Sequence, residues 1–411
     1  MSSRHGERTE DVLEDICSRM FGPDLVLRSP VVVEPSGDKE LADILVLVDD
    51  TIVVIQSKSL EIDIAELNET DFGRIGKRHD KAKKQLNTLL NAANRKSEVR
   101  GTTCLGVEIT LDWTLIRETI GIVTLNLPDE VYEDPEFRFQ YPELYSEQRG
   151  LEIHSFVLRD LWEASVELTT PGDALCYLQA RRECFKKNKV LIGNELDFLA
   201  FYKTDHPTIE QALTDSKFHI FITPGLWEDF RTGRNDEITD RAERYKSSYI
   251  IDTLVRHLRA VVEYSMEAHG LTAQESALRY LSVIGKLGKL ARMERAKIGD
   301  KLLEKVDKAK TKKFGYFIYV SIRLRIAYLF LILNEDDREK RLNFVHFLAE
   351  KACHKVDATY LVAIGTDGAP SRSGGIDAMI VDVEDMKRNT NPDADMPMFG
   401  EAKVGRIDEW S

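Results

Sequence analysis

The stretch that most constrains this chain is Glu40–Leu60, ELADILVLVDDTIVVIQSKSL. Two runs rich in Val, Ile and Leu flank a pair of aspartates, Asp49 and Asp50, at a plausible turn. The pattern predicts a β-hairpin. If the two aspartates form the turn, Asp43 lies directly opposite Gln56, with Cβ atoms roughly 5 Å apart.

Three polar side chains are expected to meet at the open end of this hairpin. Lys58 follows Gln56 by two residues, and alternate residues of a strand point to the same face. Asp43, Gln56 and Lys58 therefore converge in the predicted register. Asp-Asp is a weaker turn signal than Asp-Gly, and a slip of one residue would move Asp43 to the other face.

This constellation resembles the PD-(D/E)XK nuclease superfamily, and its Gln-x-Lys form is most similar to the Mrr-like restriction endonuclease branch. The matching residues are Asp43 and the triplet Gln56-Ser57-Lys58. Ala42 stands where the family usually has proline, and Gln56 carries one negative charge less than the commoner glutamate. The resemblance covers residues 1–130 and implies nothing about the rest of the chain.

The segments around the hairpin fit the same fold. Residues 7–20 have helical spacing, and Glu10 borders their apolar stripe. Leu25–Val33 is predicted as a strand, Lys77–Ala93 as a basic amphipathic helix, and Leu105–Thr110 and Ile120–Leu127 as further strands. The resulting order αβββαβ is the core order that the resemblance implies.

The resemblance also implies a chemistry. Mg²⁺ or Mn²⁺ would be held by oxygen atoms of Asp43, Gln56, Ser57 and Glu10, because these ions take oxygen ligands. Lys58 would orient the attacking water or stabilise charge on the phosphate. The implied activity is endonucleolytic hydrolysis of phosphodiester bonds of DNA, in restriction or anti-phage defence, with RNA left open as a substrate.

A different function class fits the same residues. Asp43 and Lys58 would then form a surface ion pair, which stabilises a fold by little, with Gln56 a solvated neighbour. On this alternative the chain is a catalytically inactive nuclease-fold scaffold or a nucleic-acid-binding protein in a defence complex.

The basic helix after the hairpin is the expected nucleic-acid contact. We expect its side chains to lie beside the site, and the candidates are Lys81, Lys83, Lys84 and Gln85. A second basic segment, Lys286–Lys313, is interpreted first as a solvated helix face. The net charge of −13 argues against non-specific coating by nucleic acid over the whole surface.

The 411 residues are enough for several domains, and the predicted fold class is α/β. We expect a restriction-endonuclease-like αβββαβ core in residues 1–150, an α/β extension in 151–206, a helix-rich domain in 207–355 and a small C-terminal α/β segment in 356–411. Helical periodicity in the third region includes Tyr316–Leu333. Such a helix-rich region would bind a partner protein of a defence system or join the subunits of a homo-oligomer.

The start of the chain lacks an apolar signal region, and its longest apolar run, Ile326–Leu333, is too short to cross a bilayer. Its five cysteines show no CxxC spacing, which argues against a zinc site or a disulfide framework. We therefore expect a cytoplasmic protein with no membrane partner.

A weaker pattern occurs in the tail. Asp377 with Glu401-Ala402-Lys403 superficially repeats the Asp…Glu-x-Lys motif, but no clean hairpin joins the two parts. The glycine-rich stretch 365–375 lacks the spacing of a phosphate-binding loop, so an ordinary loop is favoured there.

Overall fold

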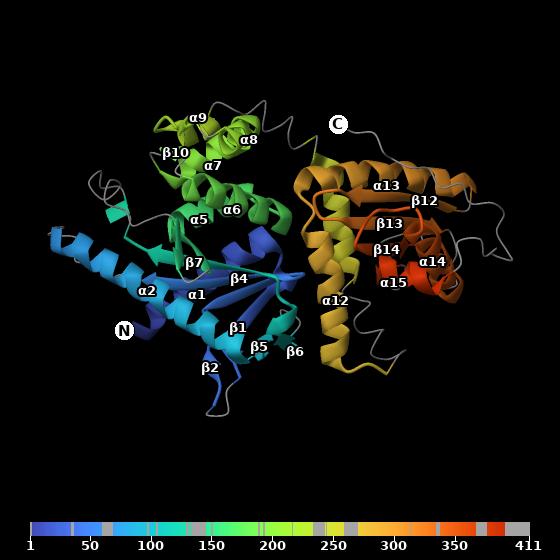
Figure 1. Cartoon of the computed structure of the whole chain (residues 1–411), viewed down its shortest axis with the longest axis horizontal. Coiled ribbons are helices and arrows are strands. Elements are labelled where there is room, and N and C mark those ends of the chain that lie inside the picture. The colour runs from blue at the N-terminus through green and yellow to red at the C-terminus, as the bar shows by residue number, and fades with distance from the viewer. Residues whose placement is uncertain are drawn as a thin grey trace. The chain divides into compact units, whose positions relative to one another are not determined.

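A computed structural model divides the chain into two compact units, residues 1–239 and 240–411 (Figure 1). The structure describes residues 2–33, 37–59, 69–96, 98–103, 106–128, 131–132, 145–148, 151–187, 190–191, 194–215, 217–232, 243, 245–258, 270–312, 314–333, 338–366 and 376–390.

The first unit is built on a mixed sheet with nine strands among the described residues. Its strands are, from one edge to the other, β6 (Glu108–Asp112), β5 (Glu98–Thr102), β1 (Val26–Val32), β3 (Ile44–Val48), β4 (Thr51–Ser59), β7 (Glu118–Asn126), β9 (Leu151–Val157) and β8 (Tyr145–Gln148), with β2 (Lys39–Glu40) paired to β1. The neighbours β4, β7 and β9 run parallel, and the other pairs are antiparallel. Central strands buried on both faces explain the nearly continuous apolar runs of β3 and β4.

Helices α1 (Ser2–Phe21) and α2 (Glu69–Lys96) both pack on this sheet. The buried stripe of α1 includes Leu13, Ile16 and Met20, which confirms the predicted helix over residues 7–20. Among its described residues the unit also contains η1 (Pro23–Leu25), η3 (Trp113–Leu115), α5 (Leu158–Glu167), α6 (Pro171–Lys186), β10 (Val190–Leu191), α7 (Glu195–Thr204), α8 (His206–Thr214), β11 (Ile220–Phe221) and α9 (Leu226–Thr232).

The second unit has a four-stranded sheet in the order β12 (Phe314–Ser321), β13 (Ile326–Leu333), β14 (Tyr360–Thr366) and β15 (Ile376–Asp382). The pair β13 and β14 is parallel and is connected by α14 (Arg338–Cys353), whose apolar side packs on the sheet. The unit also contains η4 (Lys246–Ser248), a helix over residues 249–258, α12 (Ala273–Gly288), α13 (Arg292–Lys312) and α15 (Val383–Asn389).

One helix prediction is wrong. Tyr316–Leu333 forms the β12–β13 hairpin, with Arg325 at φ 54° in the turn, and not a helix. Every residue of β13 is buried, because the strand lies inside the sheet with both faces covered. A fully buried strand lacks the alternation that distinguishes strand from helix in sequence.

The expected domain boundaries do not coincide with the division at residue 239. The boundary at 150 falls between β8 and β9, which pair with each other, and the boundary at 355 falls inside the unit that holds β12–β15. Within the described residues, no helix combines the length and the apolar character needed to cross a membrane.

Candidate functional site

The predicted hairpin register is confirmed. Ile44 pairs with Ile55 and Val48 with Thr51, so the turn is Asp49–Asp50. Asp49 has φ 61°, a left-handed conformation that aspartate tolerates better than most residues do. The register therefore puts Asp43 against the following strand at Gln56.

Asp43 is held by two hydrogen bonds from β4. Its Oδ1 accepts from Gln56 Nε2 at 2.7 Å, and its Oδ2 accepts from the backbone N–H of Ser57 at 2.6 Å. Burial raises the pKa of the Asp43 carboxyl, while the Ser57 N–H, the charge of Lys58 and the Gln56 amide each act to lower it. An acid, an amide and an ammonium group thus form one electrostatically coupled cluster, as predicted.

The face of the sheet that carries Gln56 is covered by α2. Gln56 lies beside Val123 in β7, and Val123 lies beside Ser155 in β9, so the three side chains share a face. His79 of α2 reaches this row, with its Nε2 2.6 Å from Ser155 Oγ. Figure 1 shows α2 crossing the sheet.

Glu10 belongs to the helix on the other face. Its neighbour Thr9 hydrogen-bonds Ser59 Oγ at 2.9 Å and accepts from Asn126 Nδ2 at 3.1 Å. Ser59 alternates with Lys58, so α1 packs opposite to the face of Gln56 and Lys58. Glu10 itself is exposed. The structure thus groups Asp43, Gln56 and Lys58, and places Glu10 on a helix that covers the opposite face.

Ser57 contributes through its backbone. Its N–H binds Asp43, while its hydroxyl points to the α1 face, where the register sets it beside Thr124. Both hydroxyl oxygens are buried and lack a hydrogen-bond partner among the described residues. Buried hydroxyls of this kind commonly bind an ordered water.

The four residues predicted for nucleic-acid binding separate into two groups. Lys81, Lys84 and Gln85 are exposed, but Lys83 is only 5 % exposed and lies on the inward side of α2. Its Nζ is 3.4 Å from a carboxylate oxygen of Asp80. A lysine so placed belongs to the packing under the helix and is a poor candidate for contact with a phosphate backbone.

His79 is a residue near the site that the sequence pattern did not select. It is fully buried, and together with Lys83 and Asn87 it forms a polar row at a spacing of four residues along the inward side of α2. Burial and the nearby Lys83 charge lower the pKa of His79 to about 4. The four-residue spacing beside Ala82 and Leu86 is the sequence signal that could have identified this row.

The depressed pKa of His79 predicts acid sensitivity. The unfolded chain takes up a proton near pH 6.5 and the folded chain only near pH 4, so stability is intact above pH 6.5 and falls between these values. From pH 6.5 down to pH 4, the free energy of unfolding should decrease by about 3 kcal/mol. Urea unfolding at several pH values should show this loss in the wild type and a smaller one in His79→Gln. An equal loss of stability between pH 6.5 and pH 4 in the two proteins would contradict the prediction.

The donors near Asp43 are of the class that Mg²⁺ and Mn²⁺ accept. They are one carboxylate, the Gln56 amide and backbone carbonyls, and such ions are often held by one or two carboxylates plus substrate phosphate. Across the described ranges, no group of three or more His, Cys, Asp and Glu side chains is arranged to hold a metal ion. The donor set therefore fits a weakly held ion.

Asp377, the aspartate of the Asp…Glu-x-Lys pattern in the tail, has a structural role. Asp377 in β15 is buried and accepts from Arg341 Nε of α14 at 2.8 Å. This ion pair connects helix and sheet in the second unit. Glu401 and Lys403 lie outside the described residues.

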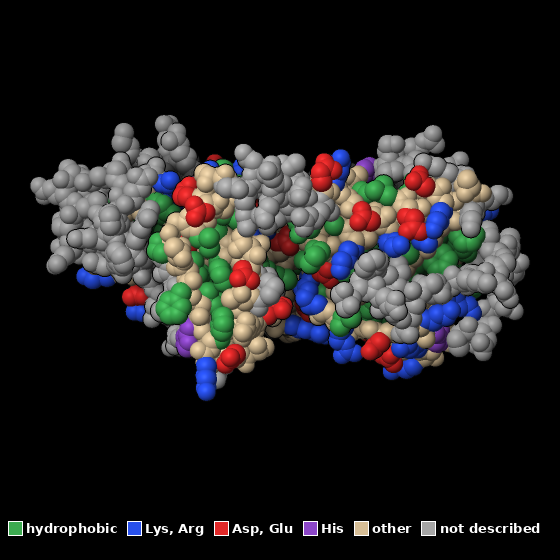
Figure 2. Space-filling model, turned by 90° about the horizontal axis from the view of Figure 1, so that it is seen from above, with side chains coloured by type: hydrophobic (Ala, Val, Ile, Leu, Met, Phe, Trp, Pro, Cys, Tyr) green, Lys and Arg blue, Asp and Glu red, His purple; other side chains and the backbone are tan. Residues whose placement is uncertain are grey.

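The second basic segment is partly buried. Lys286 lies over the ring of Tyr360 at 4.1 Å, and the Arg292 and Arg295 side chains pair with Asp252. In Figure 2 acidic and basic side chains are interspersed on the visible side of the second unit. These observations favour a structural role for those three residues.

No family model matches this chain, and neither the curated proteins nor the solved structures contain a significant match.

Proposed function

We propose that the first unit is a metal-dependent nuclease that hydrolyses phosphodiester bonds, with DNA as the favoured substrate and restriction or anti-phage defence as its setting. The observation that carries the proposal is the 2.7 Å contact between Gln56 and Asp43, with the Lys58 charge close enough to lower the Asp43 pKa. A perturbed carboxyl beside a specific cation is typical of functional sites.

The chain topology supports the same proposal. The elements α1, β1, β3, β4, α2 and β7 follow in this order along the chain, with β2 inserted after β1 and with β5 and β6 inserted before β7. β1, β3 and β4 form an antiparallel meander, and β4 and β7 are parallel. With β2, β5 and β6 set aside, this order is compatible with the αβββαβ core that the resemblance implies. Gln56 and Lys58 lie toward the carboxyl end of β4, the end where α/β sheets bind ligands.

The residues have distinct roles in this proposal. Asp43 and the Gln56 carbonyl oxygen would hold the divalent ion, which when bound would polarise the phosphate and acidify a water. Lys58 would donate hydrogen bonds to the attacking water or to the phosphate. Asp43 balances the Lys58 charge before substrate arrives, which lowers the cost of keeping an ammonium there.

One set of observations favours the second candidate, an inactive nuclease-fold scaffold or nucleic-acid-binding protein in a defence complex. Both Asp43 oxygens already accept hydrogen bonds, and Glu10 lies on the helix at the opposite face. A site with one firm carboxylate would hold metal feebly. The two candidates therefore differ most sharply in metal binding.

Calorimetry with Mg²⁺ tests this difference. We expect weak binding by the free protein and clearly tighter binding with a cleavage-resistant phosphorothioate duplex, because substrate phosphate completes the coordination. Gln56→Glu adds an anionic ligand and should tighten binding by about tenfold. A Gln56→Glu variant that binds no better, with no effect of DNA on either protein, would favour the scaffold.

The exposed lysines of α2 should contribute to DNA affinity. Each phosphate contact adds about −0.9 to the slope of log K against log salt, so the double variant Lys81→Ala, Lys84→Ala should flatten the slope by about 2. A matched control removes two exposed lysines at the C-terminal end of α6, Lys186 and the C-cap residue Lys187. Equal slopes for the wild type and both variants would remove α2 from the DNA interface.

A further inference from the structure

The second unit contains an apolar pocket of about 340 Å³ between the helix over residues 249–258 and α13. This volume is at the lower end of the range for small-molecule sites. The pocket is lined by Lys246, Tyr249, Ile250, Thr253, Leu254, Leu302, Leu303, Val306 and Thr366.

A close backbone contact holds one end of the pocket. A Cβ added at Gly299 of α13 would lie 2.0 Å from the Ser247 carbonyl oxygen, so only glycine permits this approach. Ser247 Oγ also donates to the Ala296 carbonyl at 3.0 Å. This contact fixes η4 on α13, directly before the helix that carries Tyr249, Ile250 and Leu254.

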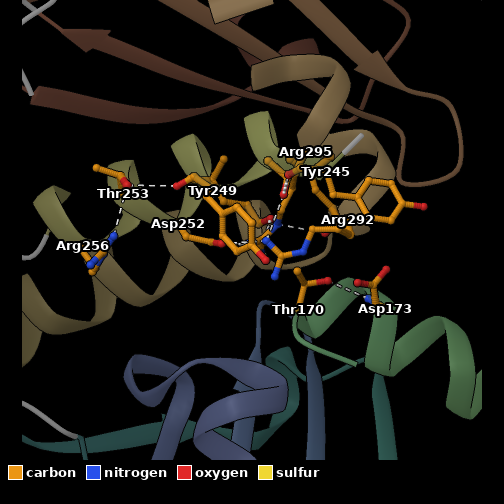
Figure 3. A network of polar contacts seen from close by, with 12 residues as sticks. Thr170, Asp173, Tyr245, Tyr249, Asp252, Thr253, Arg256, Arg292 and Arg295 are labelled. Carbon is orange, nitrogen blue, oxygen red and sulfur yellow. Dashed lines mark hydrogen bonds and ion pairs between the residues drawn. The ribbon is translucent and has the colours of Figure 1, made fainter. Parts of the chain in front are cut away.

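An ion-pair cluster at the start of α13 also holds the helix over residues 249–258. Asp252 accepts from Arg292 at 2.8 Å and from Arg295 at 2.5 Å, and Figure 3 shows the three side chains together. Arg292 also lies over the Tyr249 ring at 4.9 Å. Both arginines are buried and Asp252 is partly buried, so salt screens these pairs less than it screens a surface pair. The pocket walls are thus held in place without a ligand.

The pocket lining combines apolar side chains with one cationic side chain. Its body is aliphatic, and Tyr249 and Leu303 remain more than half exposed, at 57 % and 51 %. Large apolar side chains left open around a preformed pocket favour an apolar ligand that covers them. Lys246 is the charged member of the lining, and its ion pair with Glu243, at 3.4 Å between two exposed side chains, is easily exchanged.

From these features we infer that the second unit binds a small amphipathic molecule, with an aromatic or alkyl body between the two helices and a single anionic group at Lys246. The site is separate from the proposed nuclease residues, and its occupancy does not depend on that activity.

The fluorescent probe anilinonaphthalenesulfonate, which has an aromatic body and one sulfonate, tests the inference on the full chain. We expect saturable binding of one equivalent and displacement by decanoate below its micellar concentration. Leu303→Trp fills the pocket from a half-exposed position and should weaken binding by about tenfold or more. Ile322→Ser removes an apolar side chain that is 89 % exposed in the β12–β13 turn, and should leave binding unchanged.

The charge requirement has its own test. Lys246→Glu changes an exposed side chain and should weaken decanoate binding by about threefold, without weakening decyltrimethylammonium binding. Circular dichroism and thermal unfolding check the fold of each variant. Equal probe binding by Leu303→Trp and the wild type, or equal loss in Ile322→Ser, would overturn the site. Displacement by the cation as strong as by decanoate would overturn the anion preference.

Discussion

Replacing Asp43 with asparagine is expected to reduce DNA cleavage by about a thousandfold, more than the 10- to 100-fold typical of residues that only support a metal ligand. The same change should leave the fold at least as stable as the wild type. Asparagine can accept from the Ser57 N–H, and after a flip of the Gln56 amide it can donate to Gln56 Oε1. The change also removes a carboxylate whose pKa burial has raised.

Cleavage rates and thermal midpoints, measured on the same preparations, check both halves of this prediction. Loss of cleavage with an unchanged or higher midpoint is the pattern of a residue kept for function at a cost in stability. A sharp fall in the midpoint would make Asp43 a structural residue. Unchanged cleavage would remove it from the chemistry.

The second large effect concerns Arg181, which is fully buried in α6. Its guanidinium donates to both carboxylate oxygens of Glu195 and, at 2.9 Å, to the Ser155 carbonyl, and it lies 3.0 Å from His154 Nδ1. Arg181→Met should destabilise the protein by about 3–5 kcal/mol, because it leaves Glu195 buried without its cation. Ser155 Oγ also contacts His79, so this network connects α6 through β9 to α2, the helix that covers the face of Gln56.

Urea unfolding of four proteins isolates the pair. The double variant Arg181→Met, Glu195→Gln should be less destabilised than the sum of the single variants, because no unpaired charge is then buried. The adjacent Arg182 is a matched control: it pairs with Glu118 and Glu152 in a partly exposed setting, and Arg182→Met should cost about 1 kcal/mol or less. Strict additivity of the buried pair would contradict the coupling.

The hairpin could be predicted because its information is local. Two apolar runs, a two-residue turn and the alternation of side chains are enough to set Asp43 against Gln56. The inward turn of Lys83 was missed because a run of lysines reads as a solvated face, and only the sheet beneath α2 selects which of them is buried. The position of α1 opposite to Gln56 likewise depends on packing between distant segments.

Pairing between strands that are far apart in the sequence could not be predicted either. β9 and β8 extend the first sheet from beyond residue 130, and nothing in their local pattern names β7 as their partner. In the second unit, the sequence of β12 and β13 has helical periodicity, and only their pairing with each other and with β14 identifies them as strands. A buried central strand and a buried helix present the same continuous apolar run.

The most direct test of the proposed nuclease is conversion of supercoiled plasmid DNA by the full chain in Mg²⁺ or Mn²⁺, with EDTA and an identically purified Lys58→Ala variant as controls. We predict that the wild type produces nicked or linear plasmid and that EDTA abolishes these products. The cleavage rate of Lys58→Ala should be lower by at least about a hundredfold. Equal conversion by the two proteins, or none by either while both are folded and bind DNA, would contradict it and leave the binding scaffold as the function of this unit.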